Sequence, residues 1–139
     1  MTRNTTAILA MAIAVATLAG SARGQEVSVE SLPPSVIKTV PTCGDTAVPA
    51  TTKQIEVTFS KDMMTKQMWS WCMQSPDTFP EISDKAGVKY LHDNRTCVLP
   101  VTLKPGKTYV IWVNTQQQNA FRDTKGNPAI PYLLVFKTK

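Results

Sequence analysis

The sequence predicts an all-β fold: a two-sheet antiparallel β-sandwich of about seven strands with Greek-key connections. Short apolar or alternating segments recur between turn-forming residues, and no stretch has a convincing helical period. In addition, residues 103–109 read as a turn that delivers Tyr109 to the start of a strand. A tyrosine in that place, with its hydroxyl reaching back to upstream backbone, forms the tyrosine corner of such sandwiches.

The predicted strands are short, and turn residues separate them. Residues 54–60 alternate cleanly and place Ile55, Val57 and Phe59 on one face, as in a half-buried strand. Pro100 lies inside another strand, so an edge position or a bulge is expected there. The segment 60–67 allows a helical turn. The predicted strands are 36–40, 54–60, 68–73, 88–91, 96–103, 109–114 and 132–137.

Residues 1–24 have the composition of a secretory signal peptide, with an N-terminal membrane anchor as the alternative. Arg3 precedes an unbroken run of small and apolar residues at 7–20, and small residues at Ala22 and Gly24 suit signal peptidase. The run is shorter than the roughly 20 residues of a membrane span. We expect a signal peptide at 1–24, a linker at 25–34 and one domain at 35–139. The mature protein would be periplasmic or extracellular, with no membrane span after signal cleavage.

The charge pattern argues against nucleic acid as a partner. The full chain has a formal net charge of +5, which falls by two to +3 without Arg3 and Arg23. The remaining basic residues are scattered along the sequence, whereas a nucleic-acid site needs them clustered. Export of the protein would also keep it away from such a partner.

Five short motifs follow one another in a fixed order: the loop 41–49, Phe59-Ser60-x-x-Met63, Leu103-x-Pro105-Gly106-x-x-Tyr109, Asp123-x-x-Gly126-Asn127-Pro128 and Phe136-Lys137-Thr138. Together they resemble bacterial Ig-like domains of the SbsA type. The resemblance spans roughly residues 35–138 and implies an Ig-like sandwich that serves as an extracellular spacer, stalk or adhesive unit, with no catalytic residues. Residues 69–91 match the family least, so features particular to this protein are expected there.

The resemblance predicts a function without catalysis. We expect an exported Ig-like module with a binding or structural role at the cell envelope or outside the cell. Its partner would be an envelope or extracellular protein or polysaccharide, and no cofactor is expected. The sequence has no Gly-rich phosphate loop, no G-x-S-x-G and no H-E-x-x-H, so no catalytic residue is assigned and the chain is not expected to be an enzyme.

Three tryptophans are the candidate ligand-binding residues. Trp69 and Trp71 share a face if they lie on one strand, because side chains alternate with period 2. If Tyr109 points into the core, Trp112 on the same strand points outward. Two arrangements remain open: Trp69 and Trp71 point inward as core, or they point outward and join Trp112 in an aromatic face. Such a face could stack on sugar rings or anchor a protein.

Whether a disulfide can form depends on the same orientation of Trp69 and Trp71. An odd number, Cys43, Cys72 and Cys97, allows at most one internal bridge. Cys97 belongs to an apolar inner face, while Cys72 has the opposite parity to Trp69 and Trp71. A Cys72–Cys97 bridge across the core therefore requires tryptophans that face outward. Cys43 would then be the spare thiol. The alternative is that all three cysteines are reduced and inert.

A second functional hypothesis is metal transport. Met64, Met68, Cys72 and Met73 offer soft sulfur ligands that suit Cu(I). A small exported β-sandwich with such residues resembles periplasmic copper carriers of the CopC type. However, the chain has a single histidine, His92, and methionine more often fills gaps in a core than binds a metal.

Overall fold

The computed structural model describes residues 20, 24 and 26–139, and nearly all of the expected signal peptide lies outside these residues. The described part contains eight strands and one short 3₁₀-helix, η1 (Lys85–Gly87). No helix of this part is long and apolar enough to cross a membrane. The strands are β1 (Val36–Val40), β2 (Gln54–Phe59), β3 (Trp71–Met73), β4 (Glu81–Ile82), β5 (Lys89–Tyr90), β6 (Thr96–Thr102), β7 (Thr108–Val113) and β8 (Tyr132–Lys137).

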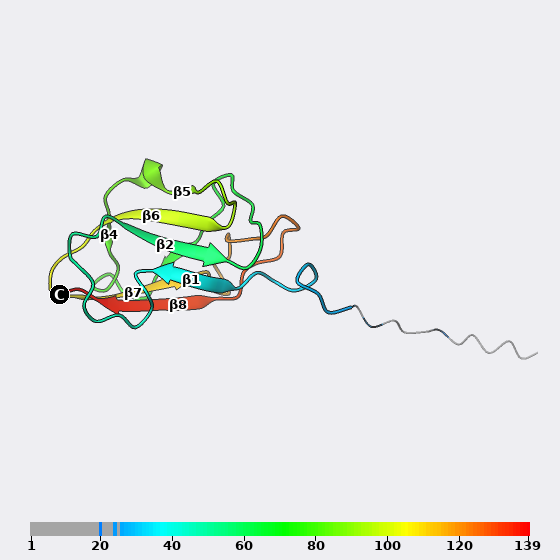
Figure 1. Ribbon diagram of the computed structural model, residues 1–139, viewed down its shortest axis with the longest axis horizontal. Coiled ribbons are helices and arrows are strands. Elements are labelled where there is room, and N and C mark those ends of the chain that lie inside the picture. Colours follow the sequence, from blue (N-terminus) through cyan, green and yellow to red (C-terminus); the bar gives the residue numbers. More distant parts are fainter. Residues whose placement is uncertain (1–19, 21–23, 25) are drawn as a thin grey trace, which may run out of the picture.

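The strands form two antiparallel sheets that Figure 1 shows as layers, with β2 and β6 in one and β7 and β8 in the other. The order of the first sheet is β1-β2-β6-β4, with β5 also paired to β6, and that of the second is β3-β7-β8. The chain crosses between the sheets after β2, β3 and β6, so distant segments pair, as in Ig-like sandwiches. The predicted all-β sandwich is confirmed. The two-residue strand β4 was not predicted, and 60–67 forms no helical turn.

The core follows the predicted alternation. Buried residues occupy every second position of β2 and β7, including Ile55, Val57, Tyr109 and Ile111. The Tyr109 hydroxyl accepts a hydrogen bond of 2.8 Å from the backbone N–H of Lys104, which is the expected tyrosine corner. Burying each large apolar side chain contributes roughly 1.5–3 kcal/mol, so these alternating faces hold the sheets together.

Pro100 lies neither on an edge strand nor at a bulge, because β6 has partners on both sides. Val101 donates its N–H to Lys53 on the β2 side, so Pro100 faces the other side of the strand. There the partner is interrupted: β4 pairs with β6 beyond Pro100, β5 pairs before it, and η1 connects them. The missing N–H of proline thus falls where no strand needs it, which is why the residue is tolerated inside the sheet.

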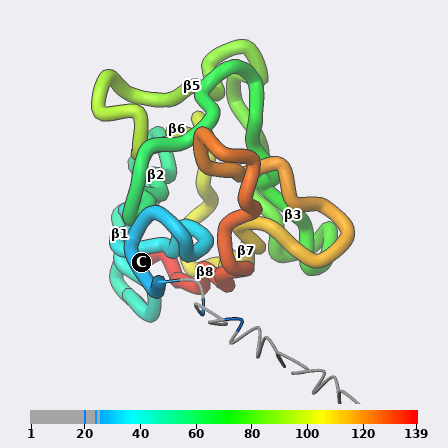
Figure 2. The backbone as a smooth tube through the Cα atoms, turned by 90° about the vertical axis from the view of Figure 1, so that its right-hand side faces the viewer, coloured from blue at the N-terminus to red at the C-terminus, as the bar shows by residue number. Residues whose placement is uncertain are grey.

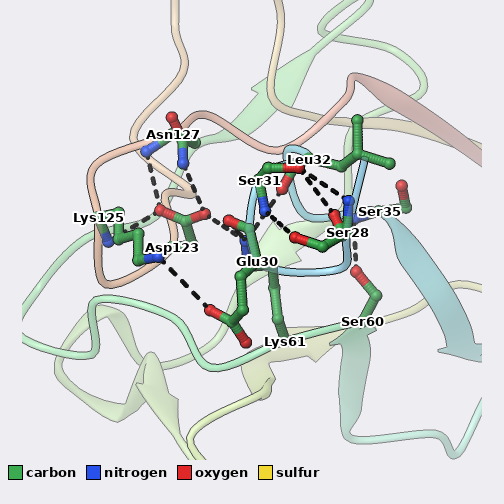
Figure 3. A network of polar contacts seen from close by, with 10 residues as sticks. All are labelled: Ser28, Glu30, Ser31, Leu32, Ser35, Ser60, Lys61, Asp123, Lys125 and Asn127. Atoms are coloured by element: carbon green, nitrogen blue, oxygen red, sulfur yellow. Dashed lines mark hydrogen bonds and ion pairs between the residues drawn. The ribbon is translucent and has the colours of Figure 1, made fainter. Parts of the chain in front are cut away.

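A buried ion pair joins the segment after β2 to the turn before β8. Lys61 Nζ lies 2.9 Å from Asp123 Oδ2, and it donates to the backbone carbonyls of Glu30 and Leu32. Asp123 also accepts from both the backbone and the side chain of Asn127 (Figure 3). The expected linker at 25–34 therefore packs on the domain in its second half through contacts to Lys61.

Candidate functional site

The structure does not bring the three tryptophans onto one face. Trp69 and Trp71 are half-buried and pack against the core, and the Trp71 ring meets Phe121 edge-on at 5.4 Å. Trp112 lies on the outer face of the second sheet, where its indole N–H donates to Gln74 Oε1 at 2.6 Å. Of the two predicted arrangements, the structure has the one in which Trp69 and Trp71 belong to the core.

The alternation of side chains along β3 also keeps Cys72 away from Cys97, and the structure contains no bridge between them. All three cysteines are free, with Cys72 and Cys97 buried and Cys43 exposed. Because Trp71 points inward, Cys72 points outward on β3, opposite Trp112 in the register, while Cys97 belongs to the core. Burial raises the pKa of Cys97 to about 12, although the nearby Trp71 indole lowers it somewhat. The predicted Cys72–Cys97 bridge is thus not formed, because it required tryptophans that face outward and Trp71 faces inward.

The sulfur side chains proposed as metal ligands do not line one common hollow. Met68 lines one hollow of the surface, whereas Met73 lines a separate hollow beside Phe79 and Tyr109. Met64 is exposed, and Cys72 is buried on the outer side of β3. Among the residues that the structure describes, no three His, Cys, Asp or Glu side chains lie close enough together to hold a metal ion.

A long open groove surrounds Trp69 and is the candidate site. It consists of two adjoining hollows, of about 740 Å³ and about 640 Å³, that share Trp69, Lys85 and Val88. We call it the Trp69 groove. The first hollow extends between β3 and residues 117–122, and the second extends along β5 to residues 65–67. The indole therefore lies where the two hollows meet, within the part of the chain that resembles the family least.

One wall of the groove is the loop after β7, which projects beside β3 in Figure 2. Asn114 begins this loop in a left-handed conformation (φ 61°) that asparagine adopts more readily than most residues. Its buried side chain accepts from the N–H of Phe121 and donates to the carbonyls of Phe121 and Ala129, at 2.9–3.1 Å. These bonds close the loop on itself, so its outer residues have a defined position.

Further bonds fasten this loop to Ser70 and to β3, which begins at Trp71. The Ala120 N–H donates to Ser70 Oγ at 2.7 Å, and the Cys72 thiol lies 3.9 Å from the carbonyl of Gln118. The amide side chains of Gln117, Gln118 and Asn119 consequently border the groove.

On the other side, Tyr90 fixes the residue before Trp69. Its hydroxyl donates to the carbonyl of Met68 at 2.8 Å. Burial raises the pKa of Tyr90 well above its ordinary value, so the hydroxyl stays protonated and remains a donor.

Among the described residues, the charged side chains that line the Trp69 groove are basic. Neither hollow is lined by Asp or Glu, whereas both have lysine or arginine in their walls. None of these basic side chains is in an ion pair with another described residue. No sequence pattern marks this cluster, because its residues come from three separate segments of the chain. They are Lys66, Lys85, Lys89 and Arg122.

Comparison with known proteins assigns the family. Residues 30–138 match the family model described as a bacterial Ig-like domain, which confirms the resemblance seen in the motifs. No curated protein matches the chain. Among solved structures, the S-layer protein rSbsC(31-844) is similar with a TM-score of 0.47 and 20% identity, over 78% of this chain and 14% of that one. The chain therefore spans about one seventh of that protein, and a likeness of this degree carries no functional argument.

Proposed function

The chain belongs to the bacterial Ig-like domain family, and we propose that it is an exported, non-catalytic module that binds an envelope or extracellular component. The Trp69 groove is the proposed binding site. The family match supports a structural or binding module rather than an enzyme. The groove favours binding over a purely structural role, because a spacer has no need of an open, polar-lined hollow on its side.

The observation that carries this proposal is the position of Trp69 between two hollows with polar walls. Binding sites combine an apolar or aromatic surface with a few placed polar groups that orient the ligand. Here the indole supplies the first, and the amides of Gln117 and Gln118 supply the second. The loop that carries these amides is held by the Asn114 and Ser70 bonds, so little ordering is needed when a ligand binds.

Retention on immobilised envelope polymers tests the binding role. Insoluble polysaccharides and purified envelope material are incubated with the folded protein, and the bound fraction is measured. We expect Trp69→Ala to lose most of the retention and Trp112→Ala, on the outer face of the second sheet, to keep it. Circular dichroism of both variants verifies that they are folded. Because Trp69 also packs against the core, Gln117→Ala is the second probe of the groove. If Trp69→Ala and Gln117→Ala both bind like the wild type, the groove is not the binding site.

Export rests on the signal-like segment at 1–24. Expression of the full chain in a bacterial host, followed by cell fractionation and mass spectrometry, tests it. We expect the protein in the periplasm or the medium with a mass that begins at Gln25. A chain of full mass that stays with the cytoplasm contradicts export, and one of full mass in the membrane fraction indicates the N-terminal anchor instead.

A further inference from the structure

We propose that the Trp69 groove binds a polysaccharide with carboxylate groups, that is, a polyuronate-type chain. This inference rests on the proposed function, since it names the ligand class of the same groove. Its basis is the gathering of Lys66, Lys85, Lys89 and Arg122 around one indole.

Two carboxylates are close to this cluster in the sequence, but neither forms an ion pair with one of its four basic side chains. Asp84 precedes Lys85 in the sequence, but its Oδ1 accepts from the N–H of Ala86 and caps η1. Asp93 lies in the sequence between His92 and Asn94, which line the second hollow. Its side chain accepts from the backbone N–H groups of Arg95 and Thr96. The groove therefore presents a positive surface that an anionic ligand would complement.

Arg122 lines the first hollow and is fixed by hydrogen bonds to neutral groups. Three of its five N–H donors are used, in bonds to the carbonyls of Asn119 and Gly126 and to Asn119 Oδ1. All three acceptors are neutral, so the charge of the guanidinium is not compensated. Two N–H groups are left for a ligand, and a guanidinium held in this way loses little side-chain freedom on binding.

The aromatic and amide residues favour a sugar chain over an acidic peptide. A sugar ring offers an apolar C–H face for the Trp69 indole and hydroxyls for the amides of Gln117 and Gln118. The groove is open along two hollows rather than closed around one small molecule. A polymer with a charge on each ring could place one ring on Trp69 and its neighbours' carboxylates near Lys85 and Lys89.

The experiment titrates the intact folded protein with three soluble polymers and follows tryptophan fluorescence. Polygalacturonate is the charged polysaccharide, its methyl ester is the same chain without charge, and polyglutamate is charged without sugar rings. We expect polygalacturonate to bind about tenfold or more tightly than either of the others. The binding should weaken several-fold between about 50 mM and about 500 mM NaCl, because salt screens exposed charges.

Two sets of variants with equal loss of charge locate the site. The triple variant Lys66→Gln, Lys85→Gln, Lys89→Gln should weaken polygalacturonate binding about tenfold. The control Lys53→Gln, Lys104→Gln, Lys137→Gln removes three exposed lysines outside the groove and should change it less than about twofold. All six side chains are exposed, so both proteins should fold.

Each possible result is decisive. If the methyl ester binds as tightly as polygalacturonate and Trp69→Ala abolishes both, the proposed binding role stands and the anionic ligand is wrong. If polyglutamate binds as tightly and Trp69→Ala has no effect, the partner is an acidic protein and the polysaccharide is wrong. If the two triple variants lose equal affinity for polygalacturonate, the polymer is attracted by the net charge of the protein alone, and the groove is not the binding site. If neither these polymers nor envelope material binds in a way that depends on Trp69, the proposed function itself fails.

Discussion

Lys61 Nζ lies 2.9 Å from Asp123 Oδ2, and the two side chains are almost entirely removed from solvent. The pair connects two of the short motifs that identify the family, the one that follows β2 and the turn before β8. It also binds the backbone of residues 30 and 32 through Lys61. One ion pair thus holds together three segments that are far apart in the sequence.

Breaking this pair should be costly. Asp123→Asn leaves the Lys61 ammonium buried without a countercharge, and such changes typically destabilise a protein by about 3–5 kcal/mol. Urea unfolding measures the loss. In a double-mutant cycle, Lys61→Met with Asp123→Asn should lose at least about 1 kcal/mol less than the sum of the single variants.

The matched control is the exposed pair Lys125–Glu30, whose nitrogen and oxygen are 3.8 Å apart. Lys125→Met should change the free energy of unfolding by less than about 1 kcal/mol, because solvent weakens such pairs. If Lys125→Met lowered the free energy of unfolding as much as Asp123→Asn does, burial would not be the reason why the Lys61–Asp123 pair matters.

The stability of the protein should fall in acid because of Asp123. Burial raises the pKa of this carboxyl, but hydrogen bonds from Lys61 and Asn127 outweigh it and hold the pKa at about 2, below the ordinary 3.8. The folded pKa is depressed, so the contribution is complete well above pH 3.8 and is lost as the pH falls through about 2. Unfolding curves measured from neutral pH to pH 2 should show this loss. In Asp123→Asn the decline should be shallower, and an unchanged pH profile would contradict the assignment.

The contribution of the tyrosine corner to stability should equal that of one hydrogen bond. Tyr109→Phe keeps the ring packed on Phe136, at 5.4 Å between centroids, and removes only the acceptor for the Lys104 N–H. We expect a loss of about 1 kcal/mol in the free energy of unfolding, the usual net value of such a bond. Chemical denaturation checks it. No change at all would mean that water replaces the hydroxyl at this exposed turn without cost.

The three thiols should differ in reactivity. Cys43 is exposed, whereas Cys72 and Cys97 are buried with raised pKa values because burial disfavours the thiolate. A maleimide reagent should therefore label one site in the native protein and all three in denaturant, as counted by mass spectrometry without reductant. A single label in denaturant would reveal a Cys72–Cys97 bridge, and rapid labelling of all three in the native protein would contradict their burial.

Local patterns predicted seven of the eight strands but not the groove. The alternation at Ile55, Val57 and Phe59 depends only on the period of a strand, and the structure has it. The orientation of Trp71 depended on which face of β3 meets Phe121, a contact across 50 residues of sequence. Neither arrangement of the tryptophans violated any local rule, so both remained open until the packing was known.

The sequence by itself determined the family, the all-β sandwich and the inward position of Tyr109, because these follow from short motifs and from alternation within one strand. Only the tertiary structure decided which cysteines and tryptophans share a face. It also decided that basic residues scattered along the sequence, such as Lys66 and Arg122, line one groove around Trp69. The physical reason is that burial periodicity is local, whereas a binding surface forms only when crossovers between the sheets bring distant loops together.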